Sequence, residues 1–417
     1  MTIERSALAT RFAMLAVMCA LFLSGSTLNS LGLNYSTDSS GGGLKLHPYT
    51  ILTTIALVLL ACGSRSFKGC WAVRQFRTAI VGAAVTFLIL MLKAATGSGQ
   101  ALGFAVDTIF AAFLVTAIFP FLQAGITRQL SIACMLFLLT ECLLALIEVI
   151  AHVNLIPIDT WYGQYFRATA LHGHPLNNAL ILVTVATATQ ACVRRWVSVS
   201  IFFLTVCALV AFGGRGALAA YLLVNTITFV RFGLRSAQRV IVLIAGGALC
   251  IVSLAWLLFS GVVGDRIMQV GAYDDSSQVR VQSIDVLNHL DWSRLLAGID
   301  PNEISRLMEQ EKVGVVENFA VDYVLMFGGI MAAVMFYFVY RTCKAFFSEV
   351  SSAGRRHLLA VLFVFTCTAL TNNSLATKTS ALYLLMVGLW CVRGQFLLPR
   401  HPDERPAYQS IKHPTRV

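Results

Sequence analysis

The chain has 417 residues, of which 57% are hydrophobic and 12% are charged, and its mean hydropathy is +0.75. Ordinary soluble domains carry about 25% charged residues, so this composition excludes a soluble globule and predicts a polytopic membrane protein. The formal net charge of +11 would suggest a nucleic-acid partner in a soluble protein. In a membrane protein, basic residues concentrated in loops on one side report topology instead, and no nucleic-acid partner is predicted.

Apolar stretches along the chain predict an all-α fold of about twelve transmembrane helices. A bilayer core about 30 Å thick requires roughly 20 apolar residues per helix, with shorter spans tolerated. The first span follows Arg5 and Arg11 and would alternatively be a signal peptide. The predicted spans are 12–29, 48–62, 79–93, 102–126, 131–152, 175–192, 196–212, 217–232, 240–261, 319–340, 358–371 and 380–392.

Basic residues in the connecting segments test this topology independently. If the N-terminus is inside, the inner segments contain most of the lysines and arginines, and each contains at least one. The positive-inside rule therefore predicts twelve retained spans with both termini in the cytoplasm. Adding or removing one helix would reverse the loops that follow and break this agreement.

Two predicted outer loops, 153–174 and 262–318, are long. In the second, Val281, Ile284, Leu287 and Leu290 recur every third residue and indicate one amphipathic helix. A second short helix is predicted further along the loop, because Asp300-Pro301 followed by Glu303 has the form of an N-cap, a first-turn proline and a capping-box acid. Long structured loops are usually functional, and we expect this one to fold over the outer membrane surface.

The predicted organisation has four parts. Helices one to nine occupy residues 1–261, the long periplasmic loop occupies 262–318, helices ten to twelve occupy 319–392, and a basic cytoplasmic tail occupies 393–417. The 11 cysteines lie in apolar stretches or in the inner basic loops, without a CxxC motif or a Cys/His cluster. Disulfides and structural zinc are therefore not expected.

Arg215 lies in Gly213-Gly214-Arg215-Gly216, a predicted outer turn between the seventh and eighth spans. Glycines let a ligand approach the backbone closely, and no acidic residue is near in the sequence. An arginine at the lip of the membrane without an acid favours an anionic ligand. Alternatively, the arginine of a plain hairpin turn extends to lipid phosphates.

A second polar group lies where the outer loop 153–174 meets the sixth span. It comprises Arg167, His172, His174 and Asn177. Imidazoles and amides can hydrogen-bond sugar hydroxyls and phosphate oxygens, although His174 and Asn177 would alternatively only cap the helix. No carboxylate flanks the histidines, so a metal site is not predicted.

The long loop supplies two further groups. Asp274-Asp275 precedes Arg280, and Glu317-Asn318 lies where the loop meets the tenth span. A carboxylate near apolar surface can have a raised pKa and act as a general base. Alternatively, Glu317 is a solvated acid at a helix N-terminus, where a negative charge is favourable.

Four acids lie inside predicted spans: Asp107, Glu141, Glu148 and Asp322. Glu141 and Glu148 are seven residues apart and share one helix face. Buried acids of this kind would suit a proton-coupled transporter. No pair of glycine- or proline-broken helices recurs in matching halves of the chain, which argues against that interpretation.

Together these features resemble the bacterial O-antigen polymerase and O-antigen ligase superfamily (Wzy and WaaL type). Nearly the whole chain has the topology of that family, with about twelve spans, both ends inside and a long outer loop before the last helices. The turn at Arg215 is similar to the small-Arg-Gly motif of the family. The stretch from Arg167 to Asn178 is similar to its arginine-then-asparagine helix start.

Segments of the long loop extend the resemblance. Ser276 to Arg280, followed by Leu295-Leu-Ala-Gly298, resembles the loop segment of the family. The stretch from Glu317-Asn318 to Gly328-Gly329-Ile330 is similar to its His-Asn-x-Tyr-Leu … Gly-Ile segment. Ligases and many relatives carry a histidine where this chain has Glu317, and this departure favours a polymerase over a ligase that uses lipid A-core.

The resemblance implies a GT-C-like fold and metal-independent glycosyl transfer, without a cofactor, at the periplasmic face of the bacterial inner membrane. The implied donor is a glycan on undecaprenyl pyrophosphate, and the acceptor is a second lipid-linked repeat unit of an exopolysaccharide or O-antigen. The bilayer, a chain-length regulator and a flippase are the other implied partners. The alternatives are an O-antigen ligase, or a secondary transporter or flippase that uses the buried acids.

Each polar group has an expected role in this reaction. Arg215 and Arg280 are expected to bind the pyrophosphate, because arginine offsets charge on a leaving diphosphate. Glu317 is expected to deprotonate the acceptor hydroxyl. The remaining substrate contacts are expected from Arg167, His172, His174, Asn177, Asn318 and Asp275.

Overall fold

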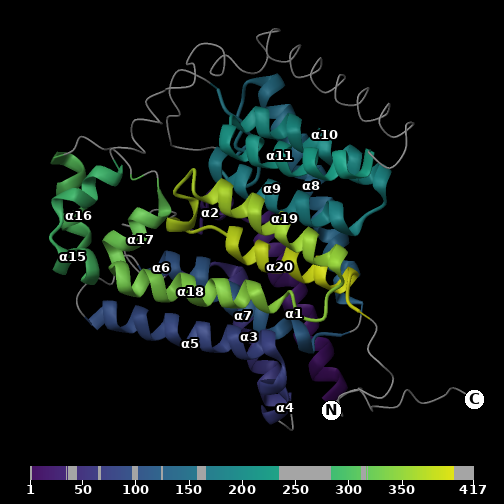
Figure 1. Cartoon of the computed structure of the whole chain (residues 1–417), viewed down its shortest axis with the longest axis horizontal. Helices are drawn as coiled ribbons and strands as arrows, with labels where there is room; N and C mark the ends of the chain where they lie inside the picture. The colour runs from purple at the N-terminus through teal and green to yellow at the C-terminus, as the bar shows by residue number, and fades with distance from the viewer. Residues whose placement is uncertain are drawn as a thin grey trace, which may run out of the picture.

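The computed structural model describes residues 2–33, 35, 45–63, 67–95, 102–123, 125–156, 166–233, 283–310, 316 and 318–398. These residues form helices and connecting turns and contain no β-strand beyond one isolated antiparallel bridge between Val350 and Leu397. The helices pack into one bundle, with α15 and α16 at one edge (Figure 1).

The helices before the long loop are α1 (Thr2–Phe22), α2 (Gly25–Ser30), α3 (Pro48–Gly63), α4 (Phe67–Ala72), α5 (Arg74–Ala95), α6 (Leu102–Ala105), the π-helical turn η2 (Val106–Phe110), α7 (Ala111–Ile118), the 3-10 turn η3 (Phe119–Phe121), α8 (Ile126–Ala151), α9 (Pro175–Cys192), α10 (Arg195–Phe212) and α11 (Arg215–Gly233). The later elements are the 3-10 turn η4 (Val286–His289), α15 (Trp292–Ala297), α16 (Pro301–Gln310), α17 (Phe319–Phe327), α18 (Gly329–Ala345), α19 (Ser352–Ala369), the 3-10 turn η5 (Ser374–Ala376) and α20 (Ala381–Gln395).

Four helical segments are long and apolar enough to cross a membrane: Arg74–Ala95, Gly103–Phe121, Ile126–Ala151 and Arg195–Phe212. They are consistent with a helical membrane protein. Helical residues also occupy most of each predicted span that the structure describes. The predicted span 240–261 lies outside the described residues, so the number of twelve stays a prediction.

Two predicted spans are interrupted. The first ends at Phe22, because the Ser24 side chain accepts a hydrogen bond from the Thr27 N–H (3.0 Å) and starts a separate helix, α2. The tenth is divided at Gly328 (φ +81°) into α17 and α18. Apolar composition predicted both spans as continuous helices because it does not register a local cap or a left-handed residue.

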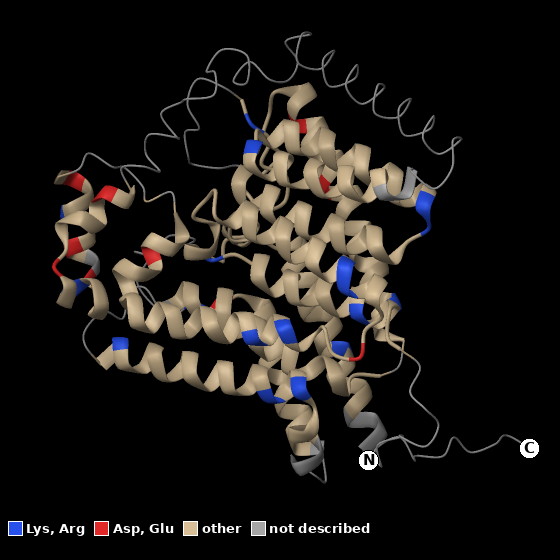
Figure 2. Cartoon of the chain, in the orientation of Figure 1, with Lys and Arg blue, Asp and Glu red and all other residues tan. Residues whose placement is uncertain are grey.

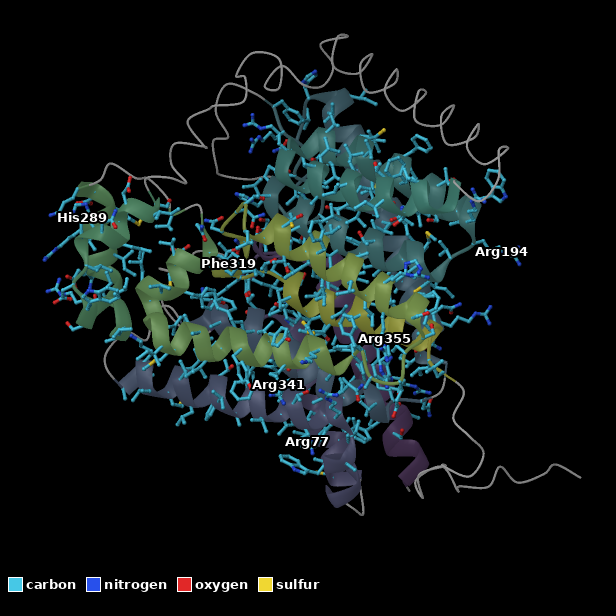
Figure 3. All side chains as sticks on the ribbon, in the orientation of Figure 1. Arg77, Arg194, His289, Phe319, Arg341 and Arg355 are labelled. Atoms are coloured by element: carbon cyan, nitrogen blue, oxygen red, sulfur yellow. The ribbon has the colours of Figure 1, made fainter. Side chains whose placement is uncertain are left out.

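Basic residues gather at one end of the bundle. Figure 3 shows Arg77, Arg194, Arg341 and Arg355 on the side opposite His289, and Figure 2 shows the acidic residues mainly on α15 and α16 and near the other helix ends. Contacts join the basic ends: Gln75 Nε2 donates to Ala345 O (2.9 Å), and Arg393 pairs with Glu349 (3.3 Å). We call the end of the bundle that carries these basic residues the basic end, and we call the opposite end the loop end.

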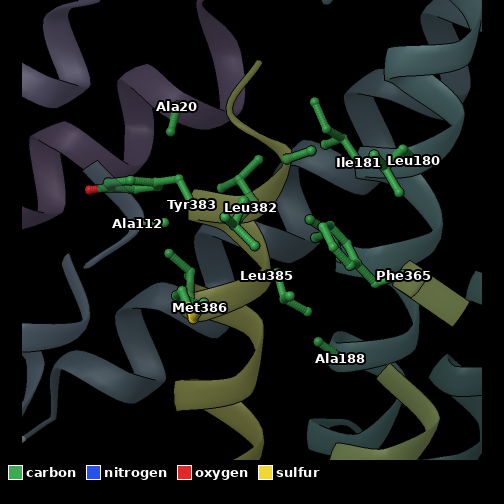
Figure 4. Packing of buried hydrophobic residues seen from close by; sticks show 14 of the residues in the cluster. Ala20, Ala112, Leu180, Ile181, Ala188, Phe365, Leu382, Tyr383, Leu385 and Met386 are labelled. Carbon is green, nitrogen blue, oxygen red and sulfur yellow. The ribbon is translucent and has the colours of Figure 1, made fainter. Parts of the chain in front are cut away.

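α20 lies at the centre of the bundle. Almost all of its residues are buried, and it packs against α9, α19, α7 and α8. Figure 4 shows Leu385 of α20 on the side that faces Phe365 and Ala188, and Met386 on the opposite side of α20. A Cβ on Gly388 would lie 2.9 Å from the Ala188 Cβ, so the small residues let α9 and α20 approach closely. A helix that is apolar on every side is expected at such a buried position.

Within the long loop, the described helices form a small apolar cluster with α17. Ile299 and Ile304 pack against Val321 and Leu325, together with Val286 and Val316. The Ile299 N–H donates to Leu325 O (2.8 Å), and Lys93 Nζ donates to Ala297 O (2.8 Å). The loop is therefore docked on α17 and on the end of α5.

The two predicted loop helices are confirmed in part. Asp300 Oδ1 accepts from the Asn302 N–H (2.9 Å), so the predicted cap of α16 is present. Glu303 does not complete the predicted capping box, because its carboxylate pairs with Arg294 of α15. The first predicted loop helix is shortened to η4 and the residues just before it, and Val281 lies outside the described residues.

Glycine determines how the loop docks. Gly298 (φ +79°) and Gly328 (φ +81°) pass backbone to backbone, and a Cβ on Gly328 would meet Leu296 O and lie 2.5 Å from Ala297 C. Any side chain at Gly328 would therefore separate α15 from the break between α17 and α18.

We expect Gly328→Ala to undock the loop helices. The strained backbone costs about 1–3 kcal/mol, and the added Cβ also displaces the segment that carries α15. Limited trypsin digestion in detergent micelles should then cleave after Arg294 and Arg306 faster than in the wild type. Gly125→Ala is the matched control, because Gly125 also has a positive φ (+95°) but nothing lies within 4 Å of its Cβ position. Equal cleavage of the two variants would contradict the docking role of Gly328.

Candidate functional site

Buried acids hold the outer loop before α9 in place. Glu148, near the end of α8, accepts hydrogen bonds from the N–H groups of Thr169 (2.6 Å) and Ala170 (2.8 Å) through Oε2, and of Leu155 (2.8 Å) through Oε1. Glu141 lies two turns earlier on the same helix and accepts from the Leu171 N–H (3.3 Å). The carboxylates satisfy backbone donors that the loop would otherwise bury without partners.

This anchored loop places Arg167 against the glycine turn between α10 and α11. The Ala168 N–H donates to Ala211 O (3.1 Å), and Arg167 Nε lies 3.4 Å from the Cβ position of Gly213. Arg167 Nε is buried and has no hydrogen-bond partner. An unsatisfied guanidinium donor is costly, and it marks a place where an anionic or polar ligand would be stabilised.

Arg215 is the first residue of α11 and is half-buried. Its side chain is therefore attached at the turn that Arg167 contacts. The glycines around it serve helix packing: Cβ atoms on Gly214 and Gly216 would lie 2.9 Å from Ala179 Cβ and 2.7 Å from Thr371 Oγ1. The sequence predicts that these glycines admit a ligand, and in the structure Gly214 and Gly216 also let the helices pack closely. The first-turn N–H groups of α11 add positive potential beside Arg215.

Thr371 and Asn372 connect this turn to the start of α17. Thr371 contacts Gly216, and Asn372 O accepts from the Phe319 N–H (3.3 Å). Asn318 caps α17 by accepting from the Ala320 N–H (3.0 Å). Phe319 lies at the loop end of the bundle (Figure 3). The structure therefore brings Arg167, Arg215 and Asn318 together along the loop end.

The two predicted histidines have different surroundings. His174 is the N-cap of α9, with its Nδ1 accepting from the Leu176 N–H (3.3 Å), so the capping alternative applies to it. His172 is buried against the edge of Phe137, and neither of its ring nitrogens makes a hydrogen bond of normal geometry. Burial lowers the pKa of both histidines to about 4, so both are neutral near pH 7.

The two neighbouring amides at the start of α9 differ, and the role of Asn177 in substrate binding stays a prediction. Asn177 is half-buried and makes no hydrogen bond among the described contacts, whereas Asn178 Nδ2 donates to Thr169 O and its Oδ1 is buried without a partner. Both amides follow the helix start, and the sequence pattern could not distinguish them because they differ only in the direction they face on α9.

Asp107 anchors a different outer segment. Its carboxylate accepts from Tyr35 OH (2.6 Å), Thr50 Oγ1 (2.6 Å) and the His47 N–H (3.1 Å), and Lys378 Nζ lies 4.7 Å above the Tyr35 ring. Asp107 and Glu148 thus have their acceptor oxygens occupied by donors from outer segments. These two acids therefore act as anchors, whereas Glu141 keeps one carboxylate oxygen without a partner.

Three predicted site residues, Asp275, Arg280 and Glu317, lie outside the described residues. Within the described part of the chain, no three His, Cys, Asp or Glu side chains gather as a metal site would require. An open polar pocket of about 600 Å³ lies on α15 and α16, and it is lined by Arg294, Asp300, Asn302, Glu303, Arg306, Leu307 and Gln310. None of the residues predicted as the site lines this pocket.

No family model matches the chain, and no curated protein sequence matches it.

We expect Glu148→Gln to destabilise the loop that carries Arg167. The amide nitrogen of glutamine would face a backbone N–H in place of an acceptor, and an unsatisfied buried donor costs about 1–3 kcal/mol. Thermal unfolding in micelles should show a clearly lower melting temperature. Glu141→Gln is the matched control on the same helix face, because Glu141 accepts one longer bond and its Oε1 has no partner. A loss in Glu141→Gln equal to that in Glu148→Gln would disprove the anchoring role of Glu148.

Proposed function

We propose that this protein is a glycosyltransferase of the bacterial inner membrane that polymerises undecaprenyl-pyrophosphate-linked repeat units at its periplasmic face. In this proposal the chain has twelve spans and both termini in the cytoplasm, so the basic end faces the cytoplasm and the loop end faces the periplasm. Arginines of the predicted inner loops lie at the basic end, which supports this orientation.

The observation that carries the proposal is the position of Arg167. Its partnerless Nε lies against the turn from which Arg215 starts, at the end of the bundle where the outer loops are anchored. Two guanidinium groups beside a helix N-terminus form a suitable site for a diphosphate. A lipid-linked diphosphate reaches a protein at this depth, since its lipid lies in the bilayer and its headgroup lies at the interface.

The proposed reaction needs no metal or cofactor from the protein. The acceptor hydroxyl attacks the anomeric carbon of the donor, the bond from that carbon to the diphosphate oxygen breaks, and the electron pair leaves with the diphosphate. Arg167 and Arg215, with Arg280 from the long loop, would offset the charge that develops there. A carboxylate at the start of α17 would take the proton of the acceptor, and the sequence nominates Glu317 for this role.

The contacts of the buried acids favour an enzyme over the transporter. Asp107 and Glu148 accept hydrogen bonds from outer segments at 2.6–3.2 Å, so they act as fixed acceptors at the loop end. The ligase alternative differs from a polymerase in its acceptor. A ligase would form a single glycosidic bond between the glycan and an acceptor such as lipid A-core.

We expect purified protein in liposomes to convert an undecaprenyl-pyrophosphate-linked repeat unit into a ladder of multiples on a gel, without nucleotide sugar or metal. Arg167→Lys and Arg215→Lys should each lower the rate of ladder formation about 100-fold or more, because lysine keeps the charge but loses the planar fork that binds a diphosphate.

Arg306→Ala is the control, because Arg306 is exposed on α16 and outside the proposed diphosphate site. Its ladder should match the wild type. If a single transfer product appeared only after lipid A-core was added, the protein would be assigned as a ligase and not as a polymerase. If neither lysine substitution changed the rate of ladder formation, the proposed diphosphate site at Arg167 and Arg215 would be refuted.

A further inference from the structure

Asp322 differs from the other buried acids of the chain. Its side chain is 8% exposed, and it makes no hydrogen bond or ion pair in the part of the chain that the structure describes. Asp107, Glu141 and Glu148 all accept at least one backbone N–H. A buried carboxylate without a partner is costly, and such a cost is tolerated at functional positions.

The position of Asp322 adds a second observation. On α17, Phe319 and Tyr323 pack into the main core, whereas Val321 and Leu325 pack against the docked loop helices. Helical geometry places Asp322 between these two faces, along the line where the loop meets the bundle. Met326, one turn further along, packs against both clusters, as expected for residues on this line.

Asp322 also lies at the same end as the arginine turn. It is in the first turn of α17, one turn after the Asn318 cap, and its N–H donates to Asn318 O (3.1 Å). Phe319 at the start of the same turn donates to Asn372 O, and the neighbouring Thr371 contacts Gly216 beside Arg215. The starts of α11 and α17 therefore flank the short Thr371–Asn372 segment.

From this geometry we propose that Asp322 is the proton acceptor for the hydroxyl of the incoming sugar, under the loop that closes over α17. This inference rests on the proposed function and assigns its catalytic base to Asp322 in place of Glu317. In the step, an Asp322 carboxylate oxygen takes the hydroxyl proton while the sugar oxygen forms its bond to the anomeric carbon. The bond to the diphosphate breaks in the same step, and the diphosphate leaves with the electron pair.

The ligand class follows from the residues at the start of α17. Asn318 is half-buried there, and its side-chain oxygen caps the helix, so its amide Nδ2 is the uncharged donor next to Asp322 that suits a sugar hydroxyl. The arginines lie on the far side of the Thr371–Asn372 segment and suit the diphosphate. The site would therefore take a neutral glycan acceptor at α17 and an anionic lipid-linked donor at α11.

The test compares Asp322→Asn, Asp322→Glu, Glu317→Gln and Glu303→Gln in liposomes with the lipid-linked repeat unit. Glu303 is the matched control, since it is also a first-turn acid but is paired with Arg294 on the surface of the loop. For Asp322→Asn we expect transfer to fall about 100-fold or more, donor binding to stay within twofold, and the melting temperature to stay equal or rise. Asp322→Glu should recover part of the activity, and Glu303→Gln should match the wild type.

An equal or higher melting temperature of the Asp322→Asn variant distinguishes a catalytic role of Asp322 from a structural one. A carboxylate that only stabilised α17 would lower the melting temperature when it is replaced, and that result would overturn the proposal. Normal ladder formation by Asp322→Asn, with loss in Glu317→Gln, would also overturn it and leave the polymerase function intact. Absence of any ladder from the wild type would remove the proposed function and this inference together.

Discussion

The loop end of this protein depends on carboxylates that are buried in the helix bundle and accept hydrogen bonds from outer loops. Glu148 holds the backbone at Thr169 and Ala170, and Asp107 holds the segment before α3 through Tyr35, His47 and Thr50. Inside a bilayer no water is available to satisfy an exposed backbone donor, so each irregular segment needs an acceptor from the protein. These acids therefore determine where the outer loops lie, and the position of Arg167 follows from them.

The long loop is fixed by a different device. The break at Gly328 frees Leu325 O to accept from the Ile299 N–H, and the glycine backbones at Gly298 and Gly328 lie in contact. The apolar faces of α16 and α17 then close over this contact. Docking through backbone contacts places the loop helices at a defined distance from the bundle. As a consequence, the first turn of α17 is covered, while its Asp322 side chain has no hydrogen-bond partner among the described residues.

The candidate site is assembled from segments that are far apart in the sequence. The start of α11 brings Arg215, the loop before α9 brings Arg167, and the start of α17 brings Asn318 and Asp322. Each of these segments begins a helix at the same end of the bundle, so their N-terminal dipoles add where an anionic substrate would lie.

Sequence alone determined the class of fold, a helical membrane protein. The lengths of the apolar stretches predicted most helix positions, and the charges of the loops distinguished the basic end from the loop end. Both signals can be read from the sequence, because the bilayer constrains the polarity of each residue directly. The pattern also nominated Arg167, Arg215 and Asn318 as site residues, and this stays a prediction. Only the tertiary structure decided that Glu148 is an anchor, that Asn178 bonds to Thr169 O, and that Asp322 is buried with no hydrogen-bond partner among the described residues. These outcomes depend on which groups face each other across segments distant in the chain, and a linear pattern carries no information about that pairing.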